Sequence, residues 1–519
     1  MKPDSKKIII VYPSYDPDNP RPDFNTDKMK KQPIGAFILA SYIKSIGYNV
    51  LLLDGRKYYK NEFKDLLIKE AADSFCVGFS VMTCQIKHSY NLSKELKKRY
   101  PGLYIVWGGI HPTLFPEQTI NPDFIDFVIN GEGEYAFEKL LAVLKEPNPD
   151  FLNILNLVWK KEDGTVEVNP LEPPIDINDL PDPDFSLIDI EMYMEGPFWN
   201  YFEYEVERLF DLNTSRGCPY RCRFCATTLP AFKKWRPLSA KRVNNLIDLA
   251  VNKYNAKHIW FVDDLFFCNK DRVYEILHHI KKQKYNFTWE ALTTIPFFRK
   301  YFTDDLLRLM RETGFIVMGM GIESGSDRVL KIIRKPQTVE SIMHAIRRCK
   351  QFDIIPKPSF ITGIPGETEE EAVQTIKLIA RIAEECPRTS FYVPSVFRPY
   401  PGTELYQECI ENGFEEPQSL EEWLQYKLHD NYFIHPKDLP WVENPKFHIN
   451  VPYVTYNYVH FKYYKDKNNL PISRKIAGKL AELRIEKDWW RLPYEYKFTI
   501  WKKRLEKRPN LKKIIRKFT

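Results

Sequence analysis

Three cysteines stand close together in the segment "TSRGCPYRCRFCATT", which begins at Thr214. Cys218, Cys222 and Cys225 have the spacing C-x3-C-x2-C, and the aromatic residue Phe224 stands directly before the third cysteine. Three thiolates are one ligand short of a four-coordinate metal site. An iron–sulfur cluster that is held by three thiolates leaves one iron open to a ligand from outside the protein. The spacing therefore predicts an iron–sulfur site with an open position.

Zinc is the alternative reading of the same cysteines. A structural zinc site needs a fourth Cys or His at a short spacing. The next cysteine, Cys268, stands alone, and no second C-x2-C occurs in the chain. The other cysteines are scattered, which argues against auxiliary clusters and against an RNA methylthiotransferase with three clustered cysteines in its amino-terminal domain.

The elements that must position these cysteines are alternating strands and helices. In residues 1–145, short apolar strands such as "KIIIVY" and "YNVLLLDG" alternate with helices, which predicts a Rossmann-like, parallel, doubly wound sheet. Residues 146–205 contain a hairpin around "KKEDGT" and the proline-rich "LEPPIDINDLPDPDF", which is typical of a linker. In residues 206–430, βα units predict a partial (β/α)6 barrel whose chemistry lies at the carboxyl ends of its strands. The cysteine segment follows the first of these strands.

Composition and charge limit the classes of partner. The net charge of the 519 residues is +7, but the last nineteen residues carry nine Lys/Arg and one Glu, so the remainder is nearly neutral and has no nucleic-acid footprint. No apolar run approaches the ~20 residues of a membrane span, and the start lacks a signal peptide, so we expect a cytoplasmic protein. Residues 431–519 predict a mostly helical, aromatic and basic extension. It fits a peripheral contact with the inner membrane surface or an anionic substrate, or a helix packed on the barrel.

Other predicted strand ends carry further motifs, namely "FVDDLFF", "GIESGSDRVL" and "GIPGET". With the cysteine spacing, these motifs resemble those of the radical SAM superfamily. The resemblance implies a 4Fe–4S cluster on the three cysteines, with S-adenosylmethionine (SAM) on the open iron. It also implies that Phe224 lies by the adenine, and that the rest of SAM is bound by Asp263 and Asp264 (ammonium), Glu323 and Ser324 (ribose and carboxylate), and Gly363, Pro365 and Gly366 (adenine). The alternatives are that Asp263 caps a helix and that "GIPGET" is only a tight turn.

The amino-terminal sheet lacks G-x-G-x-x-G after its first strand, which makes a dinucleotide a poor fit. Its segments "VWGGIHPTLFPEQT" and "INGEGEYAF" resemble the cobalamin-binding subgroup of radical SAM proteins, which includes the anaerobic magnesium-protoporphyrin monomethyl ester cyclase. The resemblance implies a cobalamin site formed by Ser80, Thr83, Gly108, Gly109, His111, Gly131 and Gly133. The D-x-H-x-x-G motif is absent around Asp54, so we expect no histidine below the cobalt. The alternatives are that the glycines are simple turns and that the sheet only shapes a substrate cleft.

The resemblance implies a cobalamin-dependent radical SAM enzyme. We expect a C-methyltransferase that removes hydrogen from an unactivated carbon through a 5′-deoxyadenosyl radical and methylates it from methylcobalamin. Oxidative cyclisation or rearrangement without methylation is the alternative within the family, and a non-catalytic sensor of cobalamin or SAM is the alternative outside it. The expected partners are a small-molecule or lipid-like substrate and an electron donor such as flavodoxin or ferredoxin.

Overall fold

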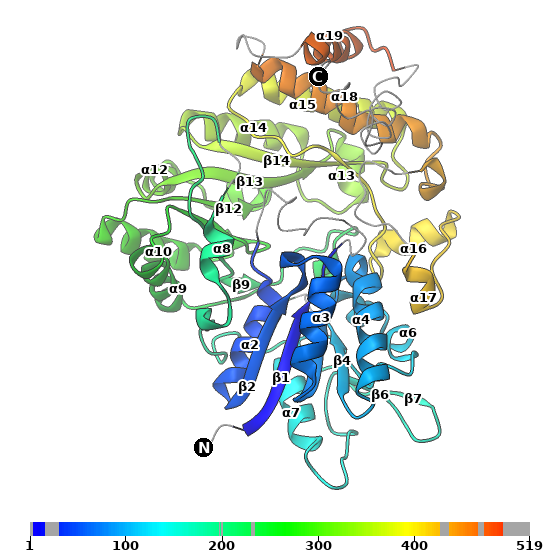
Figure 1. The fold of residues 1–519 in the computed structure, drawn as a ribbon. Coiled ribbons are helices and arrows are strands. Elements are labelled where there is room, and N and C mark those ends of the chain that lie inside the picture. Colours follow the sequence, from blue (N-terminus) through cyan, green and yellow to red (C-terminus); the bar gives the residue numbers. More distant parts are fainter. Residues whose placement is uncertain are drawn as a thin grey trace.

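The computed structural model describes residues 4–15, 31–196, 198, 201–229, 234–425, 435–464 and 472–490. Its amino-terminal part is built around one seven-stranded sheet of order β2-β1-β3-β4-β5-β6-β7, drawn in blue to cyan in Figure 1. The strands are β1 (Asp4–Tyr12), β2 (Tyr48–Asp54), β3 (Ser74–Ser80), β4 (Tyr104–Gly108), β5 (Phe127–Ile129), β6 (Leu157–Lys160) and β7 (Val166–Val168). The first five are parallel, and their order is that of a doubly wound fold.

Helices cover both faces of this sheet, which explains the uninterrupted apolar run in β1. Ile8 and Ile10 belong to one core cluster, whereas Ile9 and Val11 belong to another on the opposite face. Successive side chains of a strand point to opposite faces, so every position of β1 must be apolar when both faces are buried. The helices are α2 (Ile34–Ser45), α3 (Lys60–Ala71), α4 (Ile86–Arg99), α5 (Ile110–Leu114), α6 (Pro116–Ile120) and α7 (Glu134–Val143).

The hairpin formed by β6 and β7 belongs to this sheet. The sequence placed it in the linker 146–205, but β6 pairs antiparallel with β5 through Phe127 opposite Trp159 and Val128 opposite Val158. Val158 is fully buried in the amino-terminal core. The pairing gives β5 a second neighbour, and the proline-rich stretch follows only after β7.

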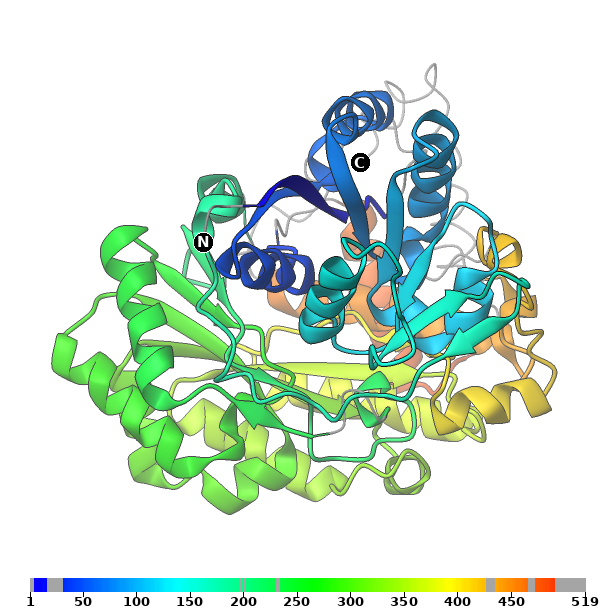
Figure 2. The same cartoon turned by 90° about the horizontal axis from the view of Figure 1, so that it is seen from below.

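The second sheet is parallel throughout and has the order β15-β14-β13-β12-β11-β8, as the partial-barrel prediction requires. Figures 1 and 2 show it in green to yellow beside the amino-terminal sheet. Its strands are β8 (Leu209–Leu212), β11 (His258–Phe261), β12 (Thr288–Thr293), β13 (Phe315–Glu323), β14 (Ile355–Thr362) and β15 (Ser395–Val396). The helices that accompany it are α8 (Ile190–Met194), α9 (Ala240–Asp248), α10 (Lys270–Gln283), α11 (Ile295–Tyr301), α12 (Asp304–Glu312), α13 (Asp327–Ile332), α14 (Val339–Gln351) and α15 (Glu369–Glu385).

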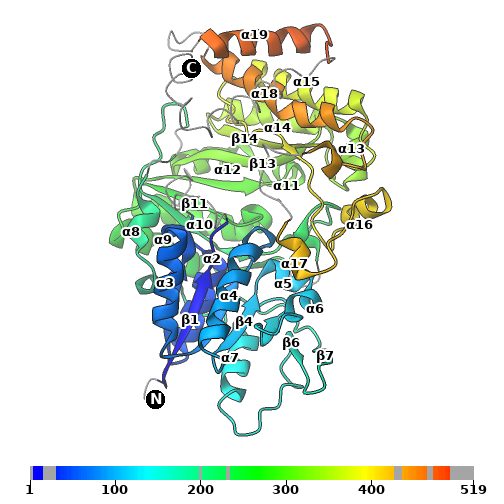
Figure 3. The same cartoon turned by 45° about the vertical axis from the view of Figure 1, so that its right-hand side comes forward.

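The remaining carboxy-terminal elements are helices that pack in two directions. The helix α17 (Leu420–Trp423), which follows α16 (Glu404–Glu411), lies against the amino-terminal part in Figure 3, and its Trp423 indole donates to the Gln118 side chain at 2.9 Å. The helix α18 (Pro445–Tyr464) instead packs on α15 and on α19 (Ile472–Glu486). None of the helices in the described ranges combines the length and apolar character of a membrane span. The basic tail, with its predicted membrane contact, lies outside the described residues.

Candidate functional site

The three cysteines surround one cavity of about 290 Å³, called here the cysteine cavity. The cysteine segment begins directly after β8, and the ends of β12, β13 and β14 contribute further walls, so the site lies at the carboxyl ends of parallel strands. Its lining includes Cys218, Tyr220, Cys222, Phe224, Cys225, Thr227, Asp264, Thr293, Met320, Glu323, Lys335, Lys357, Ser359 and Tyr392.

The cysteine loop is fixed by its own backbone. Gly217 has φ +78°, a conformation that other residues adopt only with strain, and it turns the chain into the loop. Arg223 lies between the second and third cysteines, and both its backbone N–H and its guanidinium donate to the carboxyl end of α13, at 3.1 Å to Ile333 and to Ile332 respectively. These contacts orient the loop from outside and leave its thiols directed to the cavity.

The thiols fit a multi-metal cluster by their chemistry. Burial, together with the neighbouring thiols, raises the pKa of Cys218 to about 11, and burial also raises the pKa of Cys222. Buried thiolates this close together need a cation to ionise jointly. Within the described residues, no three His, Cys, Asp or Glu side chains converge tightly enough for a single metal ion.

The adjacent carboxylates after β11 have different surroundings. The fully buried Asp263 accepts hydrogen bonds from the Thr214 N–H and hydroxyl, both at 2.5 Å, and from the Ser215 N–H at 2.9 Å. It therefore anchors the segment that leads into the cysteine loop. Asp264 instead lines the cysteine cavity, and burial raises its pKa with a further contribution from Asp263. Of the predicted pair, only Asp264 faces the space where a ligand could lie.

Glu323 and Ser324, at the end of β13, also differ. Glu323 lines the cavity with φ +69°, and its carboxylate is 3.1 Å from the Lys335 ammonium. Ser324 is fully buried on the side of the strand end that faces away from the cysteine cavity. There its hydroxyl lies 3.2 Å from the Thr375 hydroxyl of α15. The Ser324 side chain is not part of the lining of the cysteine cavity, because adjacent residues at a strand end point to opposite sides.

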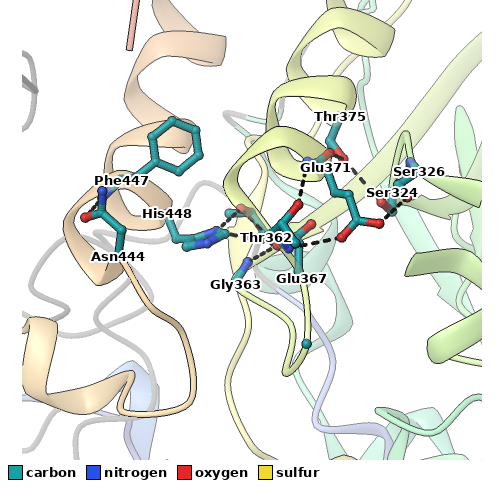
Figure 4. A network of polar contacts seen from close by, with 12 residues as sticks. Ser324, Ser326, Thr362, Gly363, Glu367, Glu371, Thr375, Asn444, Phe447 and His448 are labelled. Atoms are coloured by element: carbon teal, nitrogen blue, oxygen red, sulfur yellow. Dashed lines mark hydrogen bonds and ion pairs between the residues drawn. The ribbon is translucent and has the colours of Figure 1, made fainter. Parts of the chain in front are cut away.

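The turn that is predicted to contact the adenine of SAM is held by hydrogen bonds with Glu367 and with α18. Gly363, Pro365 and Gly366 are absent from the described lining of the cysteine cavity. In Figure 4 the Gly363 N–H donates to the buried Glu367 carboxyl group at 2.5 Å, and the Thr362 hydroxyl lies 2.9 Å from His448 Nδ1 of α18. Gly363 and Gly366 have positive φ, of +76° and +79°. The turn thus has a backbone shape that glycine adopts without strain, and α18 supports it.

A second cavity, of about 550 Å³, lies at the carboxyl ends of β3, β4 and β5, and is called here the glycine cavity. A Cβ on Gly109, whose φ is +100°, would come within 2.8 Å of the Val81 nitrogen, so only glycine fits this approach. The crevice beyond the strand ends is where doubly wound sheets bind ligands. Five predicted cobalamin residues line it, namely Ser80, Gly108, Gly109, Gly131 and Gly133.

His111 and Thr83, which were also predicted as cobalamin contacts, are not among the residues that line the glycine cavity. His111 is fully buried against Phe115 and Trp423, and burial lowers its pKa to about 3. Its Nδ1 lies 3.3 Å from the Thr83 hydroxyl. The apolar surroundings, including α17 from far along the chain, make His111 a core residue.

Four charged residues at the edge of the glycine cavity were not predicted. Arg216 pairs with Glu132 at 2.9 Å and with Glu134 at 2.6 Å, and Arg236 pairs with the same Glu132 at 2.7 Å. Burial opposes ionisation of Glu132, but the two guanidinium groups outweigh it and lower its pKa. We call these four residues the interdomain clamp. The motifs "GEGE" and "SRGC" contain three of them, but sequence spacing does not reveal their pairing.

The two cavities meet. Thr227 and Asp264 line both of them, so the open side of the cysteine loop faces the ends of the amino-terminal strands. A group bound over the glycines and a group bound at the cysteines would share one interior space. The arrangement can hold two cofactors side by side.

Comparison with known protein families gives two matches. Residues 212–379 match the radical SAM superfamily, and residues 24–141 match the B12 binding domain. In structure, the chain is similar to a radical SAM methyltransferase, TsrM, from Kitasatospora setae with cobalamin and a 4Fe–4S cluster bound. The TM-score is 0.61 at 15% identity, and the alignment covers 92% of this chain and 99% of the other.

Two relatives are similar in sequence. An uncharacterized methyltransferase of Pyrococcus horikoshii is 31% identical, over 73% of this chain and 79% of the relative. The anaerobic magnesium-protoporphyrin IX monomethyl ester cyclase of Rubrivivax gelatinosus is 24% identical, over 78% of this chain and 70% of the relative. The chain therefore belongs to the radical SAM superfamily, joins a B12 binding domain to a radical SAM domain, and has a 4Fe–4S cluster, SAM and cobalamin as its cofactors.

Proposed function

We propose that this enzyme transfers a methyl group to an unactivated carbon of a small molecule. The observation that carries the proposal is the junction of the two cavities at Thr227 and Asp264, because a methyl donor over the glycines must reach a carbon activated beside the cysteines. The names of the Pyrococcus relative and of TsrM, both methyltransferases, support the same activity.

Each side chain of the cysteine cavity has a distinct role in this proposal. When bound, the cluster and SAM supply the radical that takes hydrogen from the substrate, and cobalamin supplies the methyl group. Cys218, Cys222 and Cys225 bind the cluster and leave one iron position open. Asp264 accepts hydrogen bonds from the ammonium of SAM, since a carboxylate is a strong acceptor for a cation. Phe224 provides an apolar surface for the adenine.

The remaining proposed contacts follow from position. Glu323 lies where it can accept from the ribose, and Lys335 compensates its charge at 3.1 Å. The glycines that line the glycine cavity let the backbone approach a flat macrocycle. An electron donor such as flavodoxin or ferredoxin would reduce the cluster.

Ring formation without methylation is the second candidate. The Rubrivivax relative, whose name is that of a cyclase, favours it through 24% identity over 78% of this chain. Both reactions need the same hydrogen abstraction, so the residues of the cysteine cavity do not separate them. The two reactions differ in whether the methyl group of SAM is transferred.

Labelled SAM separates the two candidates. The protein, reconstituted anaerobically with cobalamin and a chemical reductant, should contain about four irons per chain. We expect label from the methyl carbon of SAM to appear in the extracted cobalamin, and 5′-deoxyadenosine to form. Formation of 5′-deoxyadenosine with no label in cobalamin would favour the ring-forming reaction.

The Cys222→Ala variant tests the cluster itself. We expect it to lose iron and SAM cleavage, because it removes one of the three ligands. Cys349→Ala is the matched control, since this cysteine is buried on α14 with its sulfur 3.9 Å from the Met318 sulfur. It should retain iron and cleavage with a loss of about 1 kcal/mol of stability. Retained SAM cleavage in Cys222→Ala would contradict the assignment.

A further inference from the structure

A third cavity lies beside the cysteine cavity, on the side of the carboxy-terminal helices. It encloses about 380 Å³ and is called here the aromatic chamber. Its walls come from α15, from α18, from the segment that joins α15 to β15, and from one residue ahead of β8. They comprise Phe202, Ile379, Thr389, Ser390, Phe391, Tyr392, Val393, Pro394, Thr455, Tyr456, Val459, His460 and Tyr463.

Tyr392 joins the aromatic chamber to the cysteine cavity, because it lines both. Its backbone is fixed along β14, where the Ser390 N–H donates to the Pro356 carbonyl at 2.9 Å and the Tyr392 N–H donates to the Pro358 carbonyl at 3.4 Å. The Lys357 ammonium, which also lines the cysteine cavity, lies 4.7 Å from the centre of the Tyr392 ring. Tyr392 is the lining residue that the two cavities share.

The cysteine cavity alone is too small for SAM and a substrate together. Small-molecule and cofactor sites enclose about 300–1,000 Å³, and the cysteine cavity encloses about 290 Å³. Once SAM fills it, the bulk of a substrate must lie in an adjoining space. The glycine cavity adjoins it but belongs to cobalamin under the proposed function, which leaves the aromatic chamber.

The lining of the chamber selects against charge. Among its described lining residues there is no Asp, Glu, Lys or Arg. His460 accepts a hydrogen bond from the Arg474 guanidinium at 3.1 Å, and burial together with Arg474 lowers its pKa, so the imidazole is neutral. Val393 and Tyr456 are 44% and 41% exposed, which puts apolar surface at the rim of the chamber. No carboxylate, ammonium or guanidinium among the described lining residues would pair directly with a charged ligand.

We infer that the aromatic chamber binds the uncharged part of an elongated substrate whose reacting carbon lies past Tyr392, in the cysteine cavity. This inference rests on the proposed function and adds the substrate class. Most of the lining follows residue 379, where the match to the radical SAM superfamily ends. The chamber is thus built by the part of the chain outside the shared machinery, which is where differences in substrate are expected to arise.

An uncharged fluorescent probe tests the chamber without knowledge of the substrate. N-phenyl-naphthylamine, whose emission rises in apolar surroundings, is titrated into the enzyme loaded with its cluster, SAM and cobalamin. We expect one site per chain. Val459→Trp, which fills the chamber from α18, should weaken binding about tenfold or more. The sulfonated analogue of the probe should bind the wild type about tenfold more weakly, because no lining residue offers its charge a direct counter-charge.

Two further variants make the result decisive. Val393→Trp fills the chamber from its exposed rim and decides the case if Val459→Trp loses its iron. Ile476→Trp is the matched control, because this residue is 64% exposed on α19 and does not line the chamber. It should bind the probe as the wild type does. The inference is overturned if the wild type has no such site, if the folded chamber variants bind the probe normally, or if the sulfonated analogue binds equally well. Loss of binding in the chamber variants of a protein that fails to cleave SAM would uphold the chamber and reject the proposed function.

Discussion

At the residue scale, the two carboxylates after β11 are expected to give opposite results when replaced. Asp264→Ala should weaken SAM binding about ten- to a hundredfold, because it removes charge-assisted hydrogen bonds worth about 1.5–3 kcal/mol. Its iron content should stay at the wild-type level. Asp263→Ala should lower the free energy of unfolding by about 3 kcal/mol and impair cluster assembly, since it leaves the buried Thr214 and Ser215 donors without their acceptor.

SAM titration and iron analysis on both variants check this assignment. The pair is its own control, because the two residues are adjacent and have the same side chain. Wild-type SAM affinity in Asp264→Ala would show that the ammonium lies elsewhere. Wild-type stability in Asp263→Ala would show that the loop is held by other contacts.

At the scale of single elements, the contact between α18 and the turn after β14 predicts a pH dependence. Burial raises the pKa of Glu367 to about 8 and lowers the pKa of His448 to about 4, and the two side chains are 3.5 Å apart. The folded state therefore keeps Glu367 protonated at pH values where the unfolded state releases the proton. The contribution of Glu367 to the free energy of unfolding must therefore fall as the pH rises from about 4.5 to 8, by at most about 1.4 kcal/mol per pH unit.

The contribution of His448 to stability changes with pH in the opposite direction. This change occurs between about pH 4, the pKa of His448 in the folded state, and pH 6.5, its pKa in the unfolded state. Below pH 6.5 the unfolded state binds more protons, so the two effects offset each other until the pH exceeds 6.5. We expect the wild type to lose stability between pH 6.5 and 8, and Glu367→Gln to lose less over that range. Anaerobic thermal unfolding at several pH values measures the difference. Glu370→Gln, at an exposed position of α15, is the control, and parallel pH profiles for wild type and Glu367→Gln would refute the prediction.

At the scale of the whole molecule, the interdomain clamp is expected to set the placement of the two cofactor sites. Glu132→Gln leaves the buried Arg236 and the half-buried Arg216 with a weakened partner, and breaking a fully buried ion pair costs about 3–5 kcal/mol, which is the upper limit here. Glu132 is not among the residues that line the cysteine cavity. Transfer of label from SAM to cobalamin should therefore fall more than SAM cleavage does.

The ratio of label transfer to cleavage is the measurement. Lys281→Ala is the control, because its pair with Glu312 is exposed and is worth less than about 1 kcal/mol. It should leave both rates unchanged. An equal loss of transfer and cleavage in Glu132→Gln would indicate general destabilisation instead of a change in placement.

The sequence by itself determined the local chemistry and the order of the elements. Strands such as β1 were recognisable because burial on both faces requires unbroken apolar runs. Cys218, Cys222 and Cys225 were recognisable because ligand spacing within one loop is a local property. Glycines such as Gly109 were recognisable as turn residues, because glycine is the residue that adopts a positive φ most readily. All of these signals depend on neighbours along the chain.

Only the tertiary structure decided which side chain of each pair faces a cavity. Asp263 and Asp264, or Glu323 and Ser324, look alike in sequence, and the direction of the strand end separates them. The clamp between Glu132 and Arg216, the core position of His111 against Trp423, and the chamber bounded by Tyr392 all join segments that are far apart in the chain. Such contacts depend on how the sheets and helices pack against one another. The residue types of neighbouring positions in one sequence do not indicate that packing.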